Sequence, residues 1–153
     1  MTKLKPLSSM TTPRFADVAT FFRLPIEKDL SKLDYCICGV PWDGGTTNRP
    51  GARHGPREIR NASSLVRLYH PISLKSPYDI YNVADIGDCP VNPADLQDSL
   101  LKIENFYKKI YASKTIPISV GGDHLVSLPI LRGIKRDKPL GLLQFDSHSD
   151  TWD

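Results

Sequence analysis

The stretch TIPISVGGDH, residues 115–124, shows the pattern on which our prediction of the fold rests. Its apolar side chains stand at alternate positions, Ile116, Ile118 and Val120, which is typical of a short strand. Two glycines then end the strand, because a glycine backbone adopts turns that a side chain would forbid. In α/β sheets, a strand that ends in a polar turn commonly ends at a binding site.

The same arrangement occurs at two other places. The apolar run YCICGV, residues 35–40, is followed by PWDGG, and the run LGLLQF, residues 140–145, is followed by DSHSD. We predict strands over both runs, and a further strand over residues 81–85. The carboxyl ends of parallel strands share one edge of a sheet, so the three polar turns are expected to meet there.

Helices are predicted between these strands, over residues 56–68, 93–113 and 125–135. The middle helix has the clearest pattern, because its apolar residues recur at spacings of four and three: Leu96, Leu100, Ile103, Tyr107 and Ile110. Alternating strands and helices predict a three-layer αβα fold of the α/β class with a mainly parallel sheet. We expect residues 34–153 to form one domain, with residues 1–33 as an N-terminal extension packed on it.

Composition excludes several classes of function. The 153 residues carry 20 Lys and Arg against 17 Asp and Glu, a net charge of +3 that is too small and too scattered to predict nucleic-acid binding. No apolar run approaches the roughly 18–20 residues of a membrane helix, and the N-terminus lacks the apolar stretch of a secretory signal. We therefore expect a cytoplasmic protein whose three cysteines are buried, reduced thiols.

The turn after residues 140–145 carries metal-ligand side chains. On a strand, Asp146, His148 and Asp150 would point the same way, about 7 Å apart between neighbours. Two neighbouring carboxylates repel each other unless a cation lies between them, and imidazole is a good ligand beside carboxylates. His124, at the end of the expected neighbouring strand, is a further candidate ligand, although either motif alone is compatible with an ordinary turn.

Asp123 is interpreted as a ligand or as a partner that orients an imidazole. Such a mixed set of ligands favours a binuclear site, with two metals about 3.5–4 Å apart that yield hydroxide near neutral pH. A carboxylate-rich pocket favours a cationic substrate, so hydrolysis of a C–N bond fits better than phosphoester hydrolysis, the rival reaction.

SVGGDH with FDSHSD, together with GVPWDGGTTNRPGARHGPREIRNASSLVR, resembles the ureohydrolase family of arginases and agmatinases. Within it, the chain is similar to the agmatinase-like branch that includes guanidinopropionases. The resemblance implies hydrolysis of a guanidino compound, such as agmatine, guanidinopropionate or guanidinobutyrate, to urea and an amine. It also implies two Mn²⁺ ions, with Ni²⁺ as another candidate metal.

The resemblance further implies roles for individual residues. His124, Asp146 and Asp150 would hold one metal, Asp146 would bridge to a second metal held by His148, and Asp150 would be the catalytic proton carrier. Residues expected to lie near the substrate are Asn48, Arg49, His54 and Trp152, although the residues themselves favour a loop-packing or hydrogen-bonding role for His54 over metal ligation. An aromatic residue at position 152 favours agmatine-like substrates, whereas the likeness over the whole chain favours guanidinopropionate. The choice of substrate therefore stays open between agmatine-like amines, ω-guanidino acids and free guanidine.

The family's second half carries further ligands, in a DxD motif, and substrate-binding residues that these 153 residues do not contain. We therefore expect an arginase-like fold that is incomplete at its C-terminal side, leaving a bare sheet edge. The alternative to an active hydrolase is a truncated, catalytically incompetent fragment or pseudoenzyme with a structural role. By resemblance, the full-length protein is expected to be a homotrimer or homohexamer.

Overall fold

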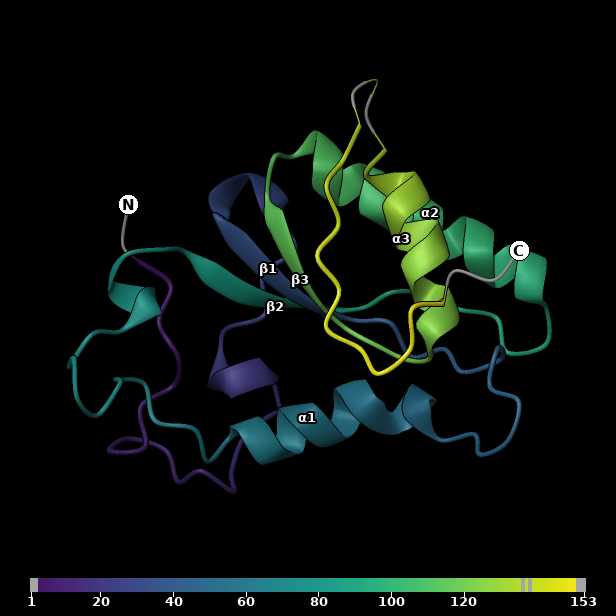
Figure 1. Cartoon of the computed structure of the whole chain (residues 1–153). Coiled ribbons are helices and arrows are strands. Elements are labelled where there is room, and N and C mark those ends of the chain that lie inside the picture. Colours follow the sequence, from purple (N-terminus) through teal and green to yellow (C-terminus); the bar gives the residue numbers. More distant parts are fainter. Residues whose placement is uncertain (1–2, 136, 138, 151–153) are drawn as a thin grey trace.

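A computed structural model describes residues 3–135, 137 and 139–150 of the chain. Its centre is a parallel sheet of three strands in the order β2-β1-β3 (Figure 1). Strand β1 is Tyr35–Gly39, β2 is Val83–Asp88 and β3 is Ile116–Val120. All three point the same way, so the turns that follow β1 and β3 lie at the same edge of the sheet.

Helices cover both faces of this sheet. Helix α1, Gly55–Ser63, lies on one side, and helices α2, Leu96–Ala112, and α3, Ser127–Gly133, lie on the other (Figure 1). Short 3₁₀-helices complete the described elements: η1 Phe21–Arg23, η2 Leu30–Lys32, η3 Ala52–His54, η4 Pro77–Asp79 and η5 His124–Val126. The prediction of a three-layer α/β fold around a parallel sheet is confirmed.

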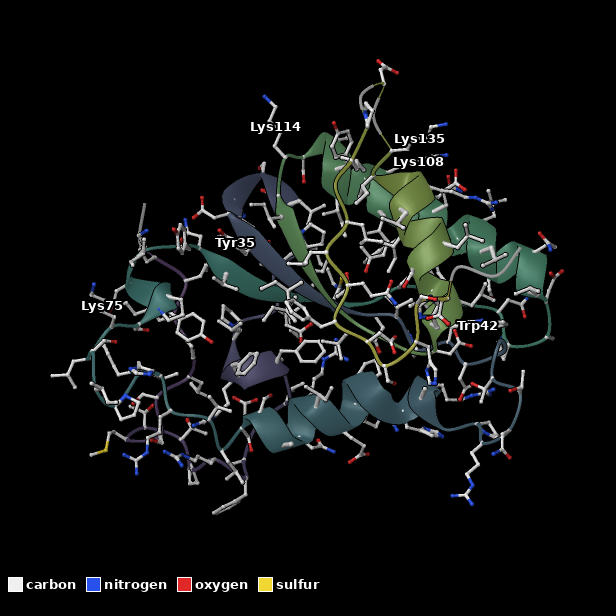
Figure 2. All side chains as sticks on the ribbon, viewed as in Figure 1. Tyr35, Trp42, Lys75, Lys108, Lys114 and Lys135 are labelled. Carbon is white, nitrogen blue, oxygen red and sulfur yellow. The ribbon has the colours of Figure 1, made fainter. Side chains whose placement is uncertain are left out.

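The core follows from the alternation of side chains along the strands. Cys36 and Cys38 of β1 face α2, whereas Ile37 faces η1 and packs with Phe21. Side chains fill the space on both sides of the sheet (Figure 2). Burial of each large apolar side chain contributes about 1.5–3 kcal/mol.

Helix α2 is the best predicted element. The Asp95 carboxylate caps it by accepting a hydrogen bond from the N–H of Asp98 (3.0 Å), and three residues of the predicted apolar stripe are buried: Ile103, Tyr107 and Ile110. The three cysteines are free and buried, as predicted. Burial raises the pKa of the Cys36 and Cys89 thiols to about 12, so neither forms a reactive thiolate near neutral pH.

The other predicted elements have different limits in the structure. Helix α1 ends at Ser63, five residues before the predicted end at residue 68, and the strand predicted over residues 81–85 lies at Val83–Asp88. The helix predicted from residue 125 begins as the 3₁₀ turn η5 before α3. Such shifts are common at element ends. No described helix is both long enough and apolar enough to cross a bilayer.

The strand predicted over residues 140–145 is wrong. Among the described residues this run pairs with no strand, and its side chains are exposed: Leu142 by 72%, Leu143 by 80% and Phe145 by 91%. An apolar run becomes a strand only when a neighbouring backbone satisfies its hydrogen bonds and its side chains find a covering layer. Strand β3, with Ile116 and Ile118 half-exposed, is therefore an edge strand.

A buried ion pair joins three elements on the α1 side of the sheet. The Arg60 guanidinium donates to both carboxylate oxygens of Asp85, at 2.8 and 3.0 Å, and to Asp88 at 2.6 Å. It also lies 4.1 Å from the centre of the Phe21 ring, and the N–H of Phe21 donates to Asp85 (3.0 Å). Asp85 is buried, so these bonds tie α1 and η1 to β2.

Burial raises the pKa of Asp85, but the hydrogen bonds from Arg60, Phe21 and Gly87 outweigh burial and hold that pKa below its ordinary value. A carboxyl whose pKa is lowered by folding stabilises the protein above its unfolded-state pKa of about 3.9. That stability is lost as the pH falls from there through the folded-state pKa.

We predict that Arg60→Met lowers the free energy of unfolding by about 3–5 kcal/mol, because it leaves the Asp85 carboxylate buried without its cation. Urea denaturation measures the change. The matched control is Arg57→Met, which removes an exposed arginine from the same helix and is expected to change stability by no more than about 0.5 kcal/mol. Equal effects of the two substitutions would contradict the role given to the ion pair.

We also predict that the stability difference between the unaltered protein and Arg60→Met narrows as the pH falls from 7 to 3, starting above about pH 4 because burial without Arg60 raises the pKa of Asp85 in the variant. Protonation of Asp85 removes the ion pair in the unaltered protein, whereas in the variant it relieves an unpaired buried charge. Denaturation midpoints measured between pH 7 and pH 3 test this. A difference that stays constant over the range would show that Asp85 is not the titrating group.

Candidate metal centre

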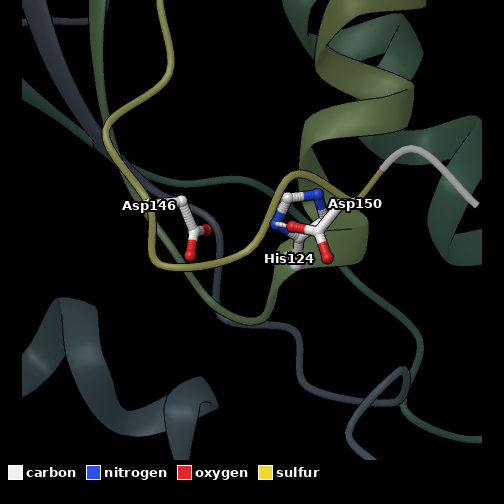
Figure 3. A group of neighbouring side chains, drawn as sticks. All are labelled: His124, Asp146 and Asp150. Carbon is white, nitrogen blue, oxygen red and sulfur yellow. Dashed lines mark ion pairs between the residues drawn. The ribbon is translucent and has the colours of Figure 1, made fainter.

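Three of the predicted ligands come together in space. His124, Asp146 and Asp150 each offer a ligand atom, and these atoms all lie within 4.8 Å of one another (Figure 3). His124 begins η5 after strand β3, whereas the two aspartates belong to the segment after residue 145. The Nδ1 of His124 lies 3.3 Å from Oδ2 of Asp150, and all three residues are exposed.

The turn before His124 fits tightly against the backbone that leaves β1. Gly122 has a φ of +92°, and a Cβ at this position would lie 2.5 Å from the carbonyl oxygen of Val40 and 2.6 Å from that of Trp42. A side chain therefore cannot be accommodated at residue 122. The second glycine of SVGGDH allows β3 to turn against the β1 loop, and this turn places His124.

The segment that carries the aspartates is bent and forms no strand. The N–H of His148 donates to Oδ1 of Asp146 (3.1 Å), and this bond lowers the pKa of Asp146. Asp150 has a φ of 53°, a left-handed conformation that aspartate tolerates better than most residues. The prediction that these three side chains share one face of a strand is thus wrong, because the strand itself does not form.

His148 lies beside the group and outside it. Its Nδ1 is 3.9 Å from Oδ1 of Asp146, and its side chain is 81% exposed. The assignment of His148 to a second metal stays a prediction.

The group fits a divalent transition metal. It offers two carboxylates and one imidazole, the donors that suit Mn²⁺ and Ni²⁺, from two segments that a bound cation would link. Asp146 and Asp150 are like charges within one group, and a cation bound there would relieve their repulsion. The arrangement favours binding of a cation, and with it the activation of water.

The loop between β1 and α1 carries the residues expected near the substrate. Asn48, Arg49 and His54 are all exposed on it, and His54 lies outside the metal-ligand group. The loop is closed by Asp43, a buried carboxylate that accepts from the N–H of Gly51 (2.7 Å) and from Nε of Arg53 (2.5 Å).

The pKa of Asp43 is raised by burial, but the donors from residues 51 and 53 outweigh burial and keep that pKa below its usual value. The remaining predicted substrate residue, Trp152, lies outside the described residues.

Residues 33–153 match the Arginase family. The chain belongs to the arginase family. It is 58% identical over 149 residues to a guanidinopropionase from Pseudomonas aeruginosa, an alignment that covers 97% of this chain and 47% of that protein. The chain thus spans about half the length of this curated relative of the arginase family.

Solved structures agree with this membership. A hypothetical agmatinase from Burkholderia thailandensis superposes with a TM-score of 0.85 at 36% identity, over 92% of this chain and 45% of that one. A formiminoglutamase from Trypanosoma cruzi, crystallised with Mn²⁺, has a TM-score of 0.63 at 22% identity, over 76% of this chain and 40% of that one. The second likeness supports the arginase fold alone.

The sequence did not predict that Asp43 and Asp123 anchor the loop after β1. The pairing of Asp43 with Arg53 was not foreseen, although an aspartate between a buried Trp42 and two glycines is a position where a loop commonly needs an anchor. The sequence predicts Asp123 as a ligand or as a partner of an imidazole, whereas in the structure its carboxylate bonds to Gly45 of the loop and lies outside the metal-ligand group.

We predict that Asp146→Asn weakens Mn²⁺ binding by at least about tenfold, because it removes one negative ligand from the group. Isothermal titration calorimetry of the metal-free protein with MnCl₂ measures the affinity. Asp17→Asn serves as the control, since Asp17 is an exposed carboxylate outside the group in the N-terminal segment. Unchanged affinity in Asp146→Asn would remove Asp146 from the site.

Proposed function

We propose that the protein is a metal-dependent hydrolase that cleaves a guanidino compound to urea and an amine. The observation that carries the proposal is the convergence of His124, Asp146 and Asp150 in a chain of the arginase family. Relatives named for guanidinopropionase and agmatinase activity support the substrate class. The chain spans about half the length of such a relative, and the activity proposed is that of the whole protein.

The residues of the group have separable roles in this proposal. His124, Asp146 and Asp150 would hold one metal ion, and Asp146 together with His148 would hold a second. Mn²⁺ is the metal we favour, with Ni²⁺ as the alternative. The bound ions would lower the pKa of a water molecule and so supply a nucleophile near neutral pH.

Asp150 carries the proton in the proposed reaction. Its carboxylate accepts a proton from the attacking water as the water oxygen bonds to the guanidinium carbon. The bond from that carbon to the substituted nitrogen then breaks as Asp150 returns the proton to this nitrogen. The proton that remains on the attacking oxygen then passes to the released amine. The products are urea and a protonated amine, so atoms and charge balance. Asp150 lies 3.3 Å from His124, within reach of the site.

The charge of the group favours a guanidinium substrate. Asp146 and Asp150 place two carboxylates at the site, which attract a planar cation and disfavour phosphate esters. The exposed loop residues Asn48 and Arg49 are proposed to contact the rest of the substrate. An arginine there would suit a substrate carboxylate, as in a guanidino acid, through paired hydrogen bonds.

We predict that the Mn²⁺-loaded protein releases urea from at least one compound in a panel of agmatine, 3-guanidinopropionate and 4-guanidinobutyrate. Asp150→Asn should lower kcat by about 10²–10⁴-fold, because asparagine cannot carry the proton. A colorimetric urea assay at saturating substrate measures this, with Asp17→Asn as the control. Absence of urea with every compound, despite bound metal, would refute the proposed reaction.

A further inference from the structure

Asp123, the residue before His124, lies outside the metal-ligand group and is bonded to the loop after β1. Its Oδ2 accepts a hydrogen bond from the N–H of Gly45 (2.6 Å), in the loop that follows β1. Its own N–H donates to the carbonyl oxygen of Trp42 (2.8 Å). Asp123 is thus bonded twice to the loop that carries Asn48 and Arg49, through its side chain and through its backbone.

The contact between this turn and the β1 loop is close on both sides. A Cβ on Gly45 would lie 2.9 Å from Oδ2 of Asp123, and a Cβ on Gly55 would lie 2.8 Å from the carbonyl oxygen of Gly121. The loop therefore meets the turn near its beginning and again where α1 begins. Trp42, whose carbonyl oxygen accepts from the N–H of Asp123, is buried beside the lower end of α3 (Figure 2).

The negative charge of the Asp123 carboxylate is not needed for its hydrogen bond to Gly45. Within the described part of the chain its Oδ1 is buried with no hydrogen-bond partner, although Oδ2 is bonded to Gly45. A buried acceptor without a partner is costly, and a charged one more so. An asparagine would accept the same bond from Gly45 without burying a charge. A carboxylate at residue 123 is explained if its negative charge acts on a cation bound at the adjacent His124.

We propose that Asp123 is a positioning residue that couples the substrate loop, residues 41–54, to the metal group. Its carboxylate holds Gly45 against the turn that ends at His124, so metal binding and loop order reinforce each other. The proposal rests on the proposed function in one respect, namely that a metal binds at His124, Asp146 and Asp150. Asp123 touches neither the metal nor the substrate in this arrangement.

The test uses amide hydrogen exchange of residues 41–54, read by mass spectrometry, in the protein with and without Mn²⁺. Without metal, Asp123→Ala is expected to speed exchange at Gly45 about tenfold, because the hydrogen bond to its N–H is lost. With Mn²⁺, exchange in the loop is expected to slow in the unaltered protein and to stay fast in the variant. Glu58→Ala, which removes an exposed carboxylate from α1, is the control.

A second variant separates the hydrogen bond from the charge. Asp123→Asn retains an acceptor for Gly45, so the metal-free loop should exchange as in the unaltered protein, while Mn²⁺ affinity falls about tenfold or more through the lost charge. This variant also guards against misfolding, because asparagine has the shape of aspartate.

Two outcomes would overturn the proposal. One is unchanged loop exchange in metal-free Asp123→Ala, and the other is equal protection of the loop by Mn²⁺ in Asp123→Ala and in the unaltered protein. In both cases calorimetry would still show Mn²⁺ bound to the unaltered protein. Failure of that protein to bind Mn²⁺ at all is a different result, which would count against the proposed function as well as the coupling.

Discussion

The parallel pairing of β1 with β3 is the constraint on which the site depends. The strands pair in register from Tyr35 with Ile116 to Gly39 with Val120, and the N–H of Val40 extends the ladder to the carbonyl oxygen of Val120 (2.8 Å). The segments that follow β1 and β3 therefore leave the sheet side by side at the same edge. A parallel sheet allows no other arrangement, because its strands all end at one edge.

The two sides of the sheet contribute differently to this arrangement. On the α2 side the core is mainly apolar, and the Tyr107 hydroxyl within it donates to Oγ of Ser119 in β3 (2.5 Å) and lies 3.4 Å from Sγ of Cys38 in β1. On the α1 side the position of the helix is specified by Arg60, whose planar guanidinium fits two carboxylates at once. Because α1 begins where the β1 loop ends, that ion pair also fixes one end of the substrate loop.

Prediction from the sequence succeeded where the signal was local. The spacing of apolar residues and the helix-start signal before residue 96 predicted helix α2. Short apolar runs before glycine turns predicted strands of the sheet. It failed at residues 140–145, whose apolar composition matches a strand but whose backbone finds no partner among the described residues. It also missed the bond from Asp123 to Gly45, since nothing in the sequence relates those two positions.

The sequence by itself determined the kinds of residues at the site: the imidazole of His124 just beyond a double glycine, and two carboxylates and an imidazole at the alternate positions 146, 148 and 150. Local chemistry is enough for that, because donor type and backbone freedom belong to individual residues. Only the tertiary structure decided which donors meet. It brought His124 to Asp146 and Asp150 and turned Asp123 towards the loop, because distances between remote segments are set by strand pairing and packing.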